Sequence, residues 1–179
     1  MSDLVIRPAT PDDLAAVTAI YQLAVRDGLA SFEYDPPDEA EMRRRHSVLV
    51  EAGYPYLVAE LDDRVMGYAY ASAYRTRPGY RFSVENSVYV AADAQRSGAG
   101  RQLLAALIER CTDGGWRQMI AVIGDSGNHA SIGLHRKLGF TFSGTIHSLG
   151  WKHGRWLDSV IMQRALGEGD QTPPPPEVR

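Results

Sequence analysis

The sequence predicts a single mixed α/β domain, and three observations lead to this fold class. The chain has 179 residues, 44% of them hydrophobic and 23% charged, so it can bury one sizeable core but is short for two full domains. Strand patterns and helical apolar spacing follow one another in the order β-α-α-β-β-β-α-β-α-β-β. Turns or loops join the strands of the first half, whereas a helix separates two strands of the second half. We therefore expect an antiparallel first half followed by a βαβ unit.

The first half begins with a short strand and two helices. Thr10 is the expected N-cap of the first helix, because Pro11 fills the first helical position and Asp13 lies three residues after the cap. Gly28 stops this helix, and Pro36-Pro37 breaks the chain before the next one. The expected elements are a strand at 4–7, helices at 11–26 and 39–52, and strands at 56–61, 65–73 and 81–90, with a polar loop at 74–80.

The second half contains the expected βαβ unit and two closing strands. An amphipathic helix precedes a nearly all-apolar strand, a pattern typical of a strand that is buried on both faces. A short helix then leads to two strands that are joined by a turn at 152–155. The expected elements are helices at 101–112 and 128–138, and strands at 119–123, 140–149 and 156–163.

The composition excludes several classes of protein. Lys and Arg number 19 against 22 Asp and Glu, and a net charge of −3 argues against a general nucleic-acid binder. The single cysteine, Cys111, excludes an internal disulfide framework and a multi-cysteine zinc site, and His46, His129, His147 and His153 have no metal-like spacing. No apolar run approaches the ~18 residues of a membrane span, and the N-terminus lacks the pattern of a secretory signal. We expect a cytoplasmic protein without a metal, a membrane partner or a nucleic-acid partner.

We assign one domain to residues 1–166. The tail, 167–179, contains Pro173–Pro176 and no core residues. We expect this tail to be disordered or polyproline-like.

A glycine-rich turn between a strand and a helix is the most informative segment. In 95–100, Gln95-Arg96-Ser97-Gly98-Ala99-Gly100, glycines allow backbone N–H groups to converge where the helix start adds about half a positive charge. Such a turn suits a pyrophosphate, with Arg96 and Arg101 beside it. A Walker A loop is excluded because no Gly-Lys-Ser/Thr ends the turn, and a dinucleotide fingerprint is excluded because Leu103 stands where a small residue is needed. The spacing alone leaves open a flexible loop with two solvated arginines.

Several separated motifs resemble the GNAT superfamily of N-acetyltransferases, and within it the phosphinothricin and methionine sulfoximine acetyltransferase branch. The turn Gln95-x-x-Gly98-x-Gly100 is similar to the acetyl-CoA signature of the superfamily. The resemblance covers about residues 5–166, in the right order. Its other motifs are Phe82-Ser83-Val84-Glu85-Asn86-Ser87-Val88-Tyr89-Val90, Ser126-Gly127-Asn128-x-x-Ser131, Leu134-His135-Arg136-Lys137-Leu138-Gly139-Phe140 and Lys152-His153-Gly154-Arg155-Trp156-Leu157-Asp158.

The resemblance implies a fold, a cofactor and an assembly. The fold would be a mixed, mostly antiparallel sheet with a splayed central strand and about four flanking helices. Acetyl-CoA would be the co-substrate, with its pantetheine arm paired to the splayed strand like an added strand. Members of this branch commonly form homodimers, with the last strands near the contact. The implied cofactor-binding residues are Val88, Tyr89, Val90, Arg96, Ser97, Gly98, Ala99, Gly100, Arg101, Asn128 and Ser131.

Attack of an amine on a thioester requires a proton acceptor, an oxyanion donor and a proton for the departing thiolate. We expect Glu85 to be the acceptor, with a raised pKa or through a water relay, since an ordinary Glu with a pKa of about 4.3 is a weak base. A surface carboxylate is the alternative. The backbone N–H near Val90 is the implied oxyanion donor. Many superfamily members carry Tyr at the position of His135, which could protonate sulfur, act as a second base, or only pack beside the cofactor.

The acyl acceptor is expected to be a small amino acid. Arg75, Arg77 and Arg81 cluster between two strands, and arginine suits bidentate recognition of a carboxylate, although a solvated basic loop is the alternative. The branch resemblance implies phosphinothricin, methionine sulfoximine or methionine sulfone as acceptor. Acetylation of protein N-termini or another amine, and a silent acyl-CoA-binding module, remain alternatives. The expected acceptor-binding residues are Arg75, Thr76, Arg77, Glu85, Asn86 and Ser87.

Overall fold

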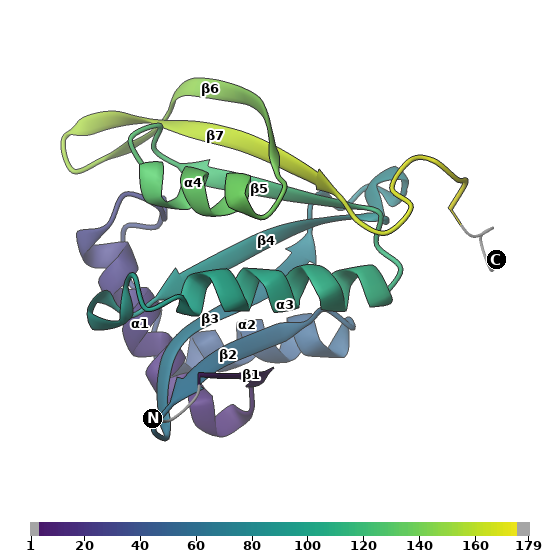
Figure 1. The fold of residues 1–179 in the computed structure, drawn as a ribbon. Coiled ribbons are helices and arrows are strands. Elements are labelled where there is room, and N and C mark those ends of the chain that lie inside the picture. The colour runs from purple at the N-terminus through teal and green to yellow at the C-terminus, as the bar shows by residue number, and fades with distance from the viewer. Residues whose placement is uncertain (1–3, 175–179) are drawn as a thin grey trace.

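The computed structural model describes residues 4–174 and forms one seven-stranded sheet of order β1-β2-β3-β4-β5-β7-β6 (Figure 1). Every neighbouring pair is antiparallel except β4 and β5, which are parallel and joined through a helix. This confirms the predicted antiparallel first half and the βαβ unit. The strands are β1 Val5–Pro8, β2 Tyr56–Leu61, β3 Arg64–Ala73, β4 Ser83–Val90, β5 Gln118–Gly124, β6 Thr141–Lys152 and β7 Arg155–Ala165.

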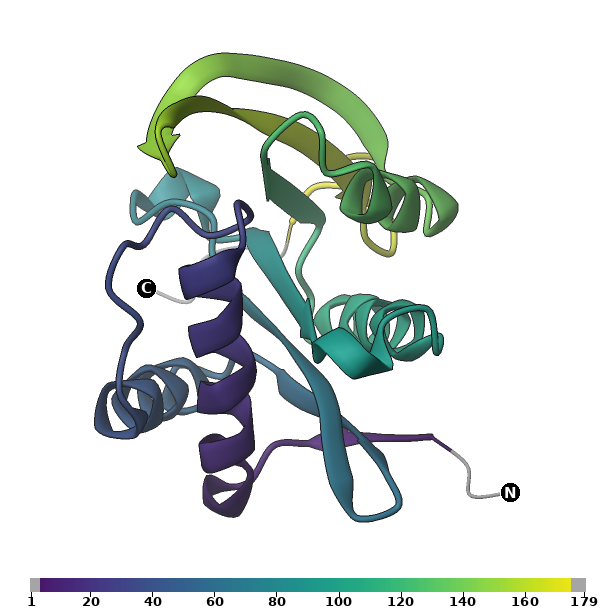
Figure 2. The same ribbon diagram turned by 90° about the vertical axis from the view of Figure 1, so that its left-hand side faces the viewer.

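Four α-helices cover the two faces of the sheet, as expected. Helices α1 and α2 lie on one face of the first strands, and α3 lies on the other (Figure 2). Helix α4 packs against β5 on the same side as α3. The helices are α1 Leu14–Asp27, α2 Glu39–Glu51, α3 Ala99–Asp113 and α4 His129–Lys137.

Each face of the sheet has its own apolar cluster. Under α3, the fully buried Leu103, Leu104 and Leu107 pack on small residues of β3, where a Cβ at Gly67 would lie 3.2 Å from a methyl group of Leu103. Burial of each leucine stabilises the fold by about 1.5–3 kcal/mol. Under α1, Leu14 and Val17 join a cluster of tyrosines on β2, β3 and β4. Strand β4 therefore lies between two differently built layers.

The central strands separate halfway along their length. Residues Ser83–Asn86 of β4 pair with Gln118–Ala121 of β5, and the two strands pair nowhere else. Beyond this point β5 continues beside β7 alone. The two strands diverge visibly towards the C-terminal end of β4 (Figure 1). The predicted splayed strand is thus confirmed, and it leaves one backbone edge of β4 without a neighbouring strand after Asn86.

Some boundaries differ from the sequence-based expectation. One 3₁₀ turn, Pro11–Asp13, precedes α1, because the Asp13 carboxylate folds back to accept bonds from the Thr10 N–H (2.7 Å) and from Arg7 (2.7 Å). Helix α3 begins at Ala99, two residues earlier than predicted. β6 continues to Lys152 through two bulges, which curl the β6–β7 hairpin over the sheet.

The first residues of the predicted tail lie against the domain. Residues 167–172 form turns, and the Arg117 guanidinium donates to the Gly169 carbonyl (3.3 Å) and the Thr172 hydroxyl (3.0 Å). These bonds are available because Arg117 lies at the start of β5, beside the end of β7. Residues 175–179, the end of the predicted Pro-rich tail, lie outside the described part of the chain. From 4 to 174, no helix has both the length and the apolar character needed to cross a bilayer.

Candidate active site

The splayed strand β4 presents successive side chains to opposite faces of the sheet. Glu85, Ser87 and Tyr89 line a cavity of about 710 Å³ that is bounded by α1, the loop after it, and the β6–β7 hairpin. Asn86 and Val88 line only the opening between the diverging strands β4 and β5, which we call the wedge, whereas Ser87 and Tyr89 border both spaces. We call the first space the large cavity. The two spaces adjoin each other along the free edge of β4.

The glycine turn brings the start of α3 directly against the end of β4. Gly98 has a φ of 93°, in the left-handed region, and Arg96 has a φ of 65°. A Cβ at Gly100 would lie 3.3 Å from a methyl group of Val90, so the first helical turn sits on the last residue of the strand. The first N–H groups of a helix lack intrahelical partners and attract anions. With exposed Arg96 and Arg101 beside it, this turn can hold a pyrophosphate.

The wedge is lined by backbone and by polar side chains of α4. Its walls are residues 86–89 of β4 and 121–124 of β5. Asn128 caps α4 by accepting a hydrogen bond from the Ser131 N–H at 3.2 Å, which uses only the oxygen of its side-chain amide. The unpaired edge of β4 opposite these residues can bind an extended, amide-containing chain in the way a strand would.

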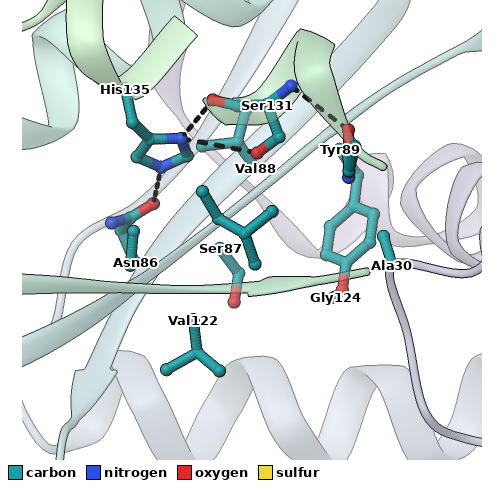
Figure 3. A pocket seen from close by; sticks show the side chains of 12 residues that line it. Ala30, Asn86, Ser87, Val88, Tyr89, Val122, Gly124, Ser131 and His135 are labelled. Atoms are coloured by element: carbon teal, nitrogen blue, oxygen red, sulfur yellow. Dashed lines mark hydrogen bonds between the residues drawn. The ribbon is translucent and has the colours of Figure 1, made fainter. Parts of the chain in front are cut away.

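His135 lies at the inner end of the wedge and is 4% exposed (Figure 3). Its Nδ1 is 2.8 Å from the Ser131 carbonyl, and its Nε2 is 3.0 Å from Oδ1 of Asn86, whose amide nitrogen donates to the Ile120 carbonyl. Burial lowers the pKa of His135, against a smaller opposing effect of the Ser131 carbonyl. The ring is therefore mainly neutral at pH 7. A neutral imidazole has one N–H for two acceptors, so a second proton would complete both hydrogen bonds.

Glu85 projects into the large cavity from β4 and is half-buried. Burial raises the pKa of its carboxyl group, and the positive charge of Arg75 partly opposes this shift. A raised pKa makes the carboxylate a better proton acceptor near neutrality. Arg75 lines the same cavity, where it lies over the Tyr74 ring at 4.6 Å and donates to the Tyr74 carbonyl at 3.3 Å. The structure thus brings together Glu85, Arg75 and Ser87, as the sequence predicted.

Three of the expected acceptor-binding residues lie elsewhere. Thr76 and Arg77 are exposed on the loop after β3 and line neither the large cavity nor the wedge. Asn86 is 6% exposed and faces away from Glu85, because neighbouring residues of a strand point to opposite sides. Its amide is engaged by His135 and Ile120, which places it in the support of the wedge and not in the large cavity.

Sequence reasoning missed most of the wall of the large cavity. Tyr21 donates to Glu33 at 3.0 Å, and Arg45 forms an ion pair with the same carboxylate at 2.7 Å. Phe32, in the loop after α1, also lines the cavity and is 36% exposed. No local motif marks these residues, because they come from elements far apart in the chain. The missed wall residues are Tyr21, Ala30, Ser31, Glu33, Tyr70, Tyr74, Tyr89, Val122, Gly124, Ile146, Leu149, Ser159 and Ile161.

Comparison with known proteins agrees with this arrangement. The model of the acetyltransferase (GNAT) family matches residues 17–140. A phosphinothricin N-acetyltransferase of Alcaligenes faecalis is 56% identical over 169 residues, 94% of this chain and 86% of the relative. An L-methionine sulfoximine/L-methionine sulfone acetyltransferase of Pseudomonas aeruginosa is 45% identical over 162 residues, 90% of this chain and 94% of the relative.

A solved structure is similar over nearly its whole length. The GNAT superfamily phosphinothricin acetyltransferase of Sinorhizobium meliloti, crystallised with acetyl-CoA, superposes with a TM-score of 0.93 at 49% identity, covering 96% of this chain and 93% of that chain. On the matching family model and these relatives, the chain belongs to the GNAT family and is an acetyltransferase.

Proposed function

We propose that the protein transfers the acetyl group of acetyl-CoA to the α-amino group of a small amino-acid-like substrate of the phosphinothricin, methionine sulfoximine or methionine sulfone type. The observation that carries this proposal is that Glu85 and Arg75 line the same cavity, beside the free edge of β4. An amino acid has an amine, which the Glu85 carboxylate can contact, and a carboxylate, which the Arg75 guanidinium can bind. The names of the relatives point to the same acceptor class.

Acetyl-CoA supplies an activated acetyl thioester. In our proposal the free edge formed by Val88, Tyr89 and Val90 pairs with its pantetheine arm, and Asn128 and Ser131 contact that arm across the wedge. The turn of Arg96, Ser97, Gly98, Ala99, Gly100 and Arg101 holds the pyrophosphate. The left-handed backbone at Gly98 and the start of α3 support this assignment.

The proposed chemistry is direct transfer. The substrate ammonium loses a proton to Glu85, directly or through a water molecule, and the resulting amine attacks the thioester carbonyl. The new C–N bond forms and the C–S bond breaks, while the backbone N–H near Val90 donates to the developing oxyanion. The nitrogen loses its remaining extra proton to solvent as the amide forms. The departing thiolate takes a proton, for which His135 on the wedge side is our candidate. Since burial lowers the pKa of His135, the ring must first be protonated to act as this acid.

We propose a cytoplasmic homodimer that acts on a small molecule and not on nucleic acid or membranes. The β6–β7 hairpin supports a protein contact, because it exposes apolar side chains that cost free energy in water. Trp151 and Trp156 pack edge to face at 5.2 Å and are 48% and 61% exposed. Phe142, Ile146 and Leu149 of β6 are also exposed. We assign the acetyltransferase domain to residues 1–166.

The test is release of free CoA from acetyl-CoA across a panel of amino acids, their amides and short N-terminal peptides. The proposal expects turnover with methionine sulfoximine, methionine sulfone or phosphinothricin and little with the amides. Preferred turnover of peptides would instead support acetylation of protein N-termini. Tight binding of acetyl-CoA without turnover of any amine would support a regulatory acyl-CoA-binding module.

A further inference from the structure

A buried lysine outside the proposed chemistry joins two distant parts of the molecule. The chain has only two lysines, Lys137 and Lys152, and Lys152 at the end of β6 is 3% exposed. Its ammonium group donates to the Val25 carbonyl at 2.6 Å and to the Ser31 carbonyl at 2.7 Å. Burial of a charge is costly unless hydrogen bonds compensate, so these bonds are the reason the ammonium can lie there.

The two carbonyls are well suited to a cation. Val25 is in the last turn of α1, whose final carbonyls have no intrahelical partner and carry the negative end of the helix dipole. Ser31 lies in the loop that follows, 28–38, which we call the α1–α2 loop. The side-chain hydroxyl of Ser31 is 3.1 Å from the hydroxyl of Tyr21. A single ammonium thus joins β6 to the end of α1 and to this loop.

The α1–α2 loop is held against the sheet at further points. A Cβ at Gly150 of β6 would lie 2.7 Å from the ring of Phe32, and a Cβ at Gly124 would lie 2.6 Å from the Ala30 carbonyl. The absence of side chains at these glycines lets the loop approach β5 and β6 closely. Tyr34 donates from its hydroxyl to the Trp151 carbonyl. Figure 2 shows the loop leaving the end of α1 beneath the β6–β7 hairpin before it descends to α2.

The loop forms one wall of the large cavity. Residues 30–33 all line this cavity, whereas only Ala30 among them also reaches the wedge. The wedge is otherwise built from β4, β5 and α4, and the glycine turn belongs to the start of α3. A change in the position of the loop therefore alters the acceptor side much more than the acetyl-CoA side.

We propose that Lys152 is a positioning residue for the acyl acceptor, because it fixes the α1–α2 loop against β6 and so sets the wall of the large cavity. This inference rests on the proposed function, since it assigns the large cavity to the acceptor. The ammonium points separate N–H bonds at two carbonyls from different elements. A guanidinium would keep the charge and the N–H donors, but its larger, planar fork fits these two carbonyls less well, so arginine can replace lysine only in part.

The test compares K152M, which keeps an unbranched side chain of similar length but removes the charge and donors, with K137M as a matched control. Lys137 is exposed at the end of α4. K152M should raise the KM for the amino-acid acceptor at least about tenfold while the KM for acetyl-CoA changes by less than about twofold. K137M should leave the acceptor KM unchanged. An unchanged acceptor KM in folded K152M, or an equal rise in both KM values, would overturn the proposal.

Two further measurements keep the inference separate from folding defects and from the proposed function. K152R should recover part of the acceptor KM, which a general loss of packing would not predict. Amide hydrogen exchange at 29–38 should be faster in K152M than in the unchanged protein, with α3 and β4 unaffected. If the unchanged protein acetylates no amino acid, the proposed function fails, and hydrogen exchange still decides whether Lys152 holds the loop. Equal exchange in both proteins would refute the inference.

Discussion

The two sides of β4 are built in different ways. The glycine turn comes from one stretch of chain between the end of β4 and the start of α3, and the wedge beside it is built from β4, β5 and α4. The large cavity is assembled from α1, the α1–α2 loop, β3, β4, β5 and the β6–β7 hairpin. A site made by one local turn can be recognised from residue spacing. A site assembled from remote elements can be recognised only when the sheet is in place.

The largest expected effect concerns the acceptor side. E85Q removes the proposed base without changing the shape of the side chain, and should lower kcat by about 10²- to 10⁴-fold. Because burial raises the pKa of Glu85, kcat/KM of the unchanged enzyme should fall as pH drops through a value above 4.5, and E85Q should lose this limb. E109Q, at an exposed position of α3, is the control. If E85Q turned over as fast as the unchanged enzyme at every pH, Glu85 would not be the base.

On the wedge side, H135F should have a smaller effect. Because burial lowers the pKa of His135, only a minority of the rings carry the proton for the thiolate at pH 7. We expect kcat to fall by about tenfold to a hundredfold, at or below the lower end of general acid catalysis. The measurement is kcat at saturating concentrations of both substrates. Nearly normal turnover would leave His135 as a packing residue beside Phe140 and Asn86.

The contribution of Arg75 separates acceptor recognition from cofactor binding. R75A should raise the KM of a carboxylate-bearing acceptor by about tenfold. Charge-assisted hydrogen bonds contribute about 1.5–3 kcal/mol, and because Arg75 is exposed, solvent screening keeps the effect at the low end of this range. The KM for the corresponding amide should change less, and the KM for acetyl-CoA should not change. R77A is the matched control, because Arg77 lies outside the large cavity. If acid and amide respond equally to R75A, recognition of the carboxylate is refuted.

The smallest effect is expected at the glycine turn. G98A places a Cβ on a residue with a φ of 93°, which costs about 1–2 kcal/mol, although no atom lies within 4 Å of the added group. The KM for acetyl-CoA should rise by about two- to tenfold, with the acceptor KM unchanged. G115A carries the same kind of strain, at a φ of 84°, beyond the other end of α3. G115A should lower the melting temperature but leave the KM for acetyl-CoA unchanged. If G98A and G115A had the same KM for acetyl-CoA, the prediction would be contradicted.

Most of the fold could be predicted because its signals are local. Apolar spacing located the helices, and Gly98 and Gly100 marked the turn into α3. The start of α1 moved because Asp13 bonds to Arg7 and Thr10, a contact with a residue before the helix. The first part of the tail is held by Arg117, about fifty residues earlier, which no local pattern reveals.

The candidate site was predicted only in part. Glu85, Arg75 and Ser87 meet as expected, since β3 and β4 form an antiparallel pair that brings the end of β3 beside the start of β4. Asn86 was expected beside Glu85 at the acceptor, but a strand turns neighbouring residues to opposite faces, so Asn86 lies on the wedge side. In the sequence, Lys152 is marked only as part of a motif that resembles the family. Its proposed role could not be predicted, because it depends on two carbonyls more than 120 residues away.

The sequence by itself determined the alternation of helices and strands, the glycine-rich turn before α3, and the family to which these motifs belong. These features depend on residues close together in the chain, whose conformational preferences act over one or two turns. Only the tertiary structure decided which side chains of β4 face the large cavity and which face the wedge, and which distant loop completes the large cavity. These features depend on the register of β4 beside β3 and β5 and on the curl of the β6–β7 hairpin, which bring together groups that the chain keeps apart.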